Sequence, residues 1–189
     1  MRTRAGRLGA TLGWAWVVGA CAAGDSHGTP GRPAAPGVGE TFSAVQLSGD
    51  RPALVWIFGV EQCLACELDE AARVVRGLQR RLGERVETVV MAVGNGDEGD
   101  RDIVRGFLAS RRISGRVEMR GREPYPEGLG AAPVSVLYVM NRHSVVEAAV
   151  AADSAEIWRS ADGRLDLANF VARLAEREGS AGRGGTGMW

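Results

Sequence analysis

Two cysteines separated by two residues are the side chains of this sequence best suited to chemistry. Cys63 and Cys66 follow the apolar run 53–58 and a glycine, and a stretch with helical periodicity comes after them. Cysteines with this spacing at the start of a helix lie close enough to form a disulfide and to exchange it with other thiols. We therefore predict that Cys63 attacks as the nucleophile and that Cys66 resolves the mixed disulfide.

The charges around the pair bear on the reactivity of its thiols. A helix N-terminus favours the thiolate of Cys63, whereas the carboxylates of Glu61, Glu67 and Asp69 disfavour it. The acidic neighbours predict a comparatively reducing disulfide. Asp69 itself has two interpretations, because it can exchange a proton with the resolving thiol or be a solvated residue of the helix.

Other roles for the cysteine pair can be compared with this one. A purely structural disulfide that closes so short a loop would constrain the unfolded chain little. A zinc site would need two more ligands, and haem attachment would need a histidine in place of Glu67. A Cu(I) carrier that uses both thiolates stays open, with His143 as the one further candidate ligand in the folded part.

Composition excludes several classes of function. All 23 basic residues are arginine, so chemistry that needs a Schiff-base lysine or a P-loop lysine is excluded. The formal net charge is zero, which gives no sign of nucleic-acid binding. We expect no cofactor and no resident metal. The length of 189 residues suits one domain.

The first 21 residues have the pattern of a bacterial export signal. Arg2, Arg4 and Arg7 precede the apolar stretch 10–20, which is too short to span a bilayer comfortably. The small residues before Cys21 resemble a lipobox, in which Cys21 becomes the lipidated first residue of the mature protein. The alternatives are ordinary cleavage and an uncleaved anchor. We expect a lipid-anchored protein whose domain lies in the periplasm or otherwise outside the cytoplasmic membrane.

The rest of the chain divides into a tether, a domain and a tail. Residues 22–39 are rich in Gly and Pro and predict a flexible tether, and residues 178–189 predict a disordered tail. Between them, residues 40–177 alternate strand and helix patterns, which favours an α/β fold with a mixed sheet and helices on both faces. The expected strands are 41–47 at an edge, 53–58, 86–93, 116–119, 134–140 and 145–151. The expected helices run from Cys63 to Leu82, from Asp100 or Asp102 through Leu108, and over 165–177.

This order resembles the thioredoxin fold and, more narrowly, the TlpA-like (redoxin type) membrane-tethered thiol–disulfide oxidoreductases. The resemblance covers residues 40–177. It is carried by Cys63-x-x-Cys66 after a strand, by Ala132-Pro133 directly before a strand and hairpin, and by the long segment between Cys66 and Pro133. It implies that Pro133 is cis and faces the cysteines, and that the backbone of Ala132 pairs with a bound peptide. An ordinary strand-opening proline is the alternative.

The resemblance also implies partners. These are exported proteins with cysteine thiols or disulfides, an apocytochrome c or another redox protein among them. The sequence departs from the family at Gln62, where a Trp is usual, at Leu64-Ala65 between the cysteines, and at Asp69, where many relatives have Glu. A non-catalytic metal carrier or binding module on the same fold is the alternative function.

Overall fold

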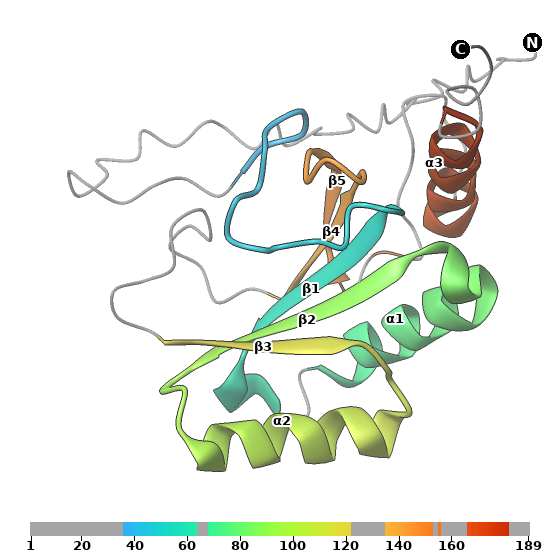
Figure 1. Cartoon of the computed structure of the whole chain (residues 1–189). Helices are drawn as coiled ribbons and strands as arrows, with labels where there is room; N and C mark the ends of the chain where they lie inside the picture. Colours follow the sequence, from blue (N-terminus) through green and yellow to red (C-terminus); the bar gives the residue numbers. More distant parts are fainter. Residues whose placement is uncertain (1–35, 64–67, 122–134, 153–154, 156–165, 182–189) are drawn as a thin grey trace, which may run out of the picture. The chain divides into compact units, whose positions relative to one another are not determined.

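The computed structural model describes residues 36–63, 68–121, 135–152, 155 and 166–181 (Figure 1). The expected export signal, Cys21 and most of the tether lie outside the described residues. So do Cys66 and the Ala132-Pro133 pair.

A mixed sheet of five strands forms the centre of the domain, in the order β3-β2-β1-β4-β5. β1 pairs with β2 and β2 with β3 in parallel, whereas β4 pairs antiparallel with β1 and with β5. Every residue of the central strand β1 is buried, as its continuous apolar sequence predicts. The strands are β1 (Ala53–Gly59), β2 (Glu87–Gly94), β3 (Arg116–Gly121), β4 (Val136–Met140) and β5 (Val146–Ala151).

Three α-helices flank this sheet, which confirms the predicted α/β class with a mixed sheet. All three pack against one face of the sheet, so the expectation of helices on both faces is wrong for the described part of the chain. They are α1 (Asp69–Leu82), α2 (Glu98–Arg111) and α3 (Leu167–Ala181), with short 3-10 helices η1 (Val60–Cys63) and η2 (Gly83–Arg85). α1 connects the parallel pair β1 and β2, and α2 connects β2 and β3. Two successive right-handed crossovers in the same direction place both helices on one face of the sheet. None of the described helices is long and apolar enough to cross a membrane.

The core has one layer on each face of the sheet. Leu54, Trp56 and Phe58 of β1 belong to the layer into which the apolar faces of α1, α2 and α3 pack. The alternate residues of β1 point into the other layer. In the described part of the chain, the segment 36–49 covers this second layer, and its Phe42 and Val45 are almost fully buried there.

The prediction of an edge strand over 41–47 is wrong. Only Thr41 forms a bridge, with Val145, before the chain turns. Phe42 and Val45 both enter the core although they are three residues apart, whereas in an extended strand two such side chains point to opposite faces. Burial of the two side chains therefore decides the path of this segment.

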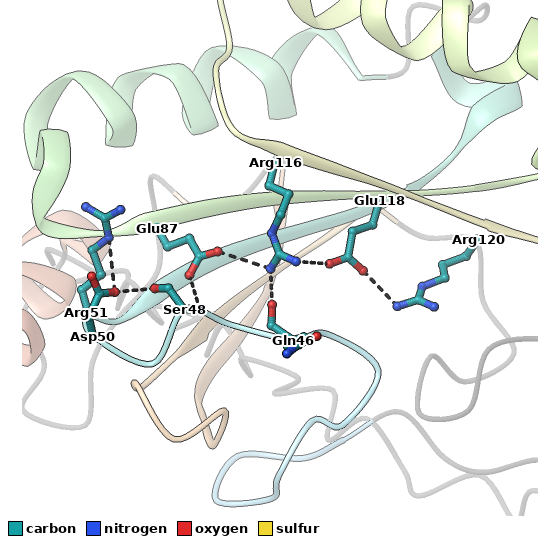
Figure 2. A network of polar contacts seen from close by, with 8 residues as sticks. All are labelled: Gln46, Ser48, Asp50, Arg51, Glu87, Arg116, Glu118 and Arg120. Atoms are coloured by element: carbon teal, nitrogen blue, oxygen red, sulfur yellow. Dashed lines mark hydrogen bonds and ion pairs between the residues drawn. The ribbon is translucent and has the colours of Figure 1, made fainter.

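Arginines of the edge strand β3 hold the segment in place. Arg120 Nη2 donates to the carbonyl oxygen of Ala44 at 2.6 Å, and Arg116 Nη2 donates to that of Gln46. Glu118 lies between the two arginines and accepts from Arg116 at 2.7 Å and from Arg120 at 2.9 Å (Figure 2). We call these three residues the β3 clamp.

Three helix boundaries differ from the predictions. α1 begins at Asp69 and not at Cys63. α2 is capped by Asp97, whose side chain accepts from the Asp100 amide at 2.8 Å, because the Asp100 carboxylate already accepts from the loop amides before the helix. α3 continues through Ala181, into the expected tail. The predicted end of α1 at Leu82 is confirmed, and Gly83 follows it as the C-cap with φ at +57°.

Candidate functional site

Cys63 lies in the η1 turn, directly after the central strand. The turn is closed by Gln62, whose Oε1 accepts from the backbone N–H of Gly59 at 2.9 Å. In the sequence, Gln62 stands out only as a departure from the family pattern, and its role in closing the turn was not predicted. An amide side chain three residues after a strand-ending glycine is the signal that could have indicated it.

The turn packs tightly against the neighbouring strand and helix. Cys63 is half-buried and contacts the same core layer as Phe107 of α2. Gly94 ends β2 beside the turn, where a Cβ atom would lie 2.6 Å from Val60 Cγ2. Only a glycine fits at this position, so the ends of β1 and β2 meet at the cysteine turn.

Burial controls the acidity of the Cys63 thiol. It raises the pKa of Cys63 to about 11, and the negative charge of Glu61 adds to the rise, while a backbone hydrogen bond at Cys63 opposes it. The expected opposition from Glu61 is therefore present. The expected stabilisation of the Cys63 thiolate by a helix N-terminus is absent, because α1 begins only at Asp69 and Cys63 is not in its first turn. The thiol is protonated at neutral pH.

Asp69 is held by an arginine of α2. Its Oδ1 accepts from Nε of Arg111 at 3.2 Å and from Nη2 of the same guanidinium. The guanidinium lies 5.7 Å from the ring centre of Phe107, within the range of a cation–π contact. Asp69 is thus an ion-paired, partly exposed residue at the start of α1. Its predicted proton transfer with Cys66 stays a prediction.

The start of β4 lies at the same end of the sheet as Cys63. Val136 is paired with Ile57, near the end of β1, and the indole Nε1 of the buried Trp56 donates to Ser135 Oγ at 2.8 Å. The described chain therefore re-enters beside the cysteine end of β1, two residues after Pro133 in the sequence. The roles predicted for Ala132 and Pro133 stay predictions.

His143 lies at the other end of the sheet. It is in the turn between β4 and β5, and Met140 before that turn is paired with Ala53, the first residue of β1. The seven residues of β1 separate the two ends by roughly 20 Å. One chain therefore cannot bind a single metal ion with both His143 and Cys63. Within the described ranges, no group of three or more His, Cys, Asp or Glu residues could hold a metal.

Solved structures with similar backbones have low sequence identity to this chain. The C-terminal domain of a candidate thiol–disulfide oxidoreductase from Bacteroides thetaiotaomicron has a TM-score of 0.50 and 5% identity, over 68% of this chain and 79% of that one. A DsbF homologue from Corynebacterium diphtheriae has a TM-score of 0.46 and 16% identity, over 77% and 85%. A thiol:disulfide interchange protein of the thioredoxin family from Chlorobium tepidum has a TM-score of 0.43 and 20% identity, over 76% of this chain and 96% of that one.

No protein-family model and no curated protein matches the sequence. The fold is therefore established by structure. A mixed five-stranded sheet with the order β3-β2-β1-β4-β5 carries a half-buried cysteine at the end of its central strand, and the backbone matches the Bacteroides domain over two thirds of this chain. The protein has a thioredoxin-like fold.

Proposed function

We propose that the protein is an exported thiol–disulfide oxidoreductase that exchanges a Cys63–Cys66 disulfide or dithiol with the thiols of other exported proteins. One observation carries this proposal. Cys63 lies in a tight turn at the end of the central strand, at the sheet end where the chain returns from the Ala132-Pro133 segment into β4. In the proposed site, a bound peptide pairs with the backbone of Ala132 while its sulfur reacts at Cys63.

The exchange balances without a cofactor. The Cys63 thiolate attacks one sulfur of a substrate disulfide, and the other substrate sulfur leaves as a thiolate and takes up a proton. The Cys66 thiolate then attacks Cys63 Sγ and releases the substrate sulfur that is bonded to it. A Cys63–Cys66 disulfide forms, and two electrons pass from the dithiol to the substrate. The reverse sequence oxidises a substrate dithiol. Asp69 is the proposed proton carrier for Cys66.

The raised pKa of Cys63 sets the character of this reaction. A thiol with a pKa of about 11 is a small fraction thiolate at neutral pH, which slows attack, but the thiolate is strongly nucleophilic once formed. Environments that stabilise a cysteine thiolate make the disulfide more oxidising, so the opposite environment here favours a reducing disulfide. We propose reduction of substrate disulfides as the favoured direction.

Export and anchoring belong to the same proposal. The arginine-rich start, the short apolar stretch and Cys21 support cleavage and lipidation at Cys21, with residues 22–39 as a tether to the membrane. Mass spectrometry of the protein from a bacterial host, with the Cys21→Ser variant as the control, distinguishes a lipidated Cys21 from ordinary cleavage or an uncleaved anchor.

A Cu(I) carrier that uses the two thiolates is the second candidate. The soft thiolates of a Cys-x-x-Cys pair suit Cu(I), and this site would have to work without His143, which lies at the far end of the sheet. Such a carrier would bind the metal and catalyse no exchange.

Reduction of insulin disulfides by dithiothreitol tests the proposal. We expect catalysis by the wild type, complete loss with Cys63→Ser, and a trapped mixed disulfide with Cys66→Ser. Absence of catalysis by the wild type, together with tight Cu(I) binding that is lost in Cys63→Ser, would refute the oxidoreductase and support the Cu(I) carrier.

A further inference from the structure

A cavity of about 260 Å³ between α1 and α2 is lined mainly by arginine. Its walls are Asp69, Ala72, Arg73, Arg76, Arg80 and Arg111. Three of these arginines lie at i, i+3 and i+7 along α1, which places them on one stripe of that helix. We call this cavity the arginine groove.

The charges of the groove are only partly compensated. Asp69 pairs with Arg111, and Glu70, outside the lining, pairs with Arg73. Among the described residues, neither Arg76 nor Arg80 has an ion pair or a side-chain hydrogen bond. Since the whole chain has no net charge, two unpaired guanidinium groups beside two paired ones form a local positive surface.

One end of the groove is close to the cysteine turn in the sequence. Asp69 opens α1, six residues after Cys63 in the sequence, and it also lines the groove. Phe107 of α2 contacts the same core layer as Cys63 and carries the Arg111 guanidinium over its ring. A polypeptide that reacts at Cys63 can therefore extend into the groove along the junction of α1 and α2.

From this geometry we infer that the arginine groove binds an acidic segment of the polypeptide that exchanges disulfides at Cys63. The inference rests on the proposed function for the identity of the partner. Guanidinium groups bind carboxylates through two parallel hydrogen bonds. From Arg73 to Arg80 the helix rises about 10 Å, which about three residues of an extended peptide span.

A peptide fits this surface better than a membrane does. The arginines come from two helices and line a concave site, where an extended chain can insert carboxylate side chains. Anionic headgroups would instead call for basic residues spread over an outward face, and the exposed arginines of α2 outside the groove are paired with acids of their own helix.

Binding of a labelled, cysteine-free acidic peptide to the full chain tests the inference. We would use fluorescence anisotropy with a peptide that carries Glu at alternate positions, and with the same peptide carrying Gln as the control. We expect the Glu peptide alone to bind, and its binding to weaken when salt is raised from 0.02 to 0.5 M.

Two charge-matched variants locate the site. R76Q/R80Q and R105Q/R177Q each remove two positive charges from exposed or partly exposed helix positions. We expect the first pair of substitutions to weaken binding by about threefold to thirtyfold and the second to leave it unchanged. Thermal unfolding of both variants verifies that they are folded.

The outcomes separate the groove from the catalytic proposal. Equal weakening in both variants, equal binding of the Gln peptide, or preferential binding of anionic lipid vesicles would overturn the groove as a peptide site. Exchange with a small neutral disulfide is measured in parallel on the wild type. If the Glu peptide binds in the groove but the protein does not exchange the small disulfide, the oxidoreductase proposal is refuted and the groove remains a peptide site. If the protein exchanges the small disulfide but does not bind the peptide, the groove proposal is refuted and the oxidoreductase proposal stands.

Discussion

At the scale of single residues, the acidity of Cys63 is the property with the clearest consequence. Burial raises its pKa to about 11, so little thiolate exists at pH 7. In a Cys21→Ser/Cys66→Ser variant, which keeps Cys63 alone, we expect slow alkylation by iodoacetamide at pH 7 and a rate that increases through pH 10. A rate that levels off below pH 8 would show that the pKa of the Cys63 thiol is not raised.

The same shift makes stability depend on pH. The folded protein holds the Cys63 proton more tightly than the unfolded chain, whose thiol titrates near about 8.5. The contribution of the thiol to stability is therefore fully present below pH 8.5 and is lost as the pH rises toward 11. Burial also raises the pKa of Tyr138, whose unfolded-state titration starts near about pH 10. Between about pH 8.5 and 10, urea unfolding of the single-cysteine variant should therefore show this loss, and the same variant with Cys63→Ala should not.

Glu61 contributes a smaller part of the shift. Removing its charge by Glu61→Gln should lower the pKa of Cys63, but not to the ordinary value, because burial is the larger cause. We expect alkylation at pH 8 to become faster by less than tenfold, since tenfold corresponds to one full pKa unit. Glu84→Gln, at an exposed position of η2, is the matched control and should leave the rate unchanged.

At the scale of elements, the β3 clamp shows how a segment without regular structure is fixed. The strand β3 lies at the edge of the sheet, and its arginines reach carbonyl groups of the segment that covers the second core layer. Arg116 donates to the Gln46 carbonyl (Figure 2), and Arg120 donates to the Ala44 carbonyl. The clamp therefore joins parts of the chain that are 70 and 76 residues apart. It also pairs the charges of an otherwise exposed edge strand.

Replacing one clamp arginine measures this contribution. Arg120→Met keeps most of the apolar stem but removes the hydrogen bond to the Ala44 carbonyl and the ion pair with Glu118. We expect a loss of about 1 kcal/mol in the free energy of unfolding, measured in urea. Arg105→Met on α2 removes only exposed ion pairs and should change stability by less than half of that. Equal losses of stability in Arg120→Met and Arg105→Met would mean that the hydrogen bond to the Ala44 carbonyl adds no stability.

At the scale of the whole molecule, the repeating apolar patterns predicted most of the fold. The buried runs of β1 and β2 and the helical stripe of α1 appear within one or two residues of the predicted strand bounds and of the predicted end of the helix. Such patterns are local and depend on burial on one or both faces, so a sequence shows them directly. The cysteine turn could be placed at the end of β1 for the same reason.

What the sequence could not show depends on contacts between distant residues. The start of α1 at Asp69, the Arg111 ion pair and the hydrogen bond of Trp56 to Ser135 each join positions whose neighbours are set only by the folded chain. The path of 41–47 likewise follows from where Phe42 and Val45 find a core to enter. Pattern and spacing carry no information on these pairings.

The separation of the two sheet ends gives a test of the function at this largest scale. His143 is roughly 20 Å from the cysteine end of β1 and is hydrogen-bonded to Arg142 beside it in the turn. His143→Gln should therefore leave both insulin reduction and any Cu(I) affinity of the dithiol within twofold of the wild type. Cys63→Ser, at the opposite end, should abolish both. A large loss of copper affinity in His143→Gln at protein concentrations where the chain is monomeric would contradict the register of β4 on β1.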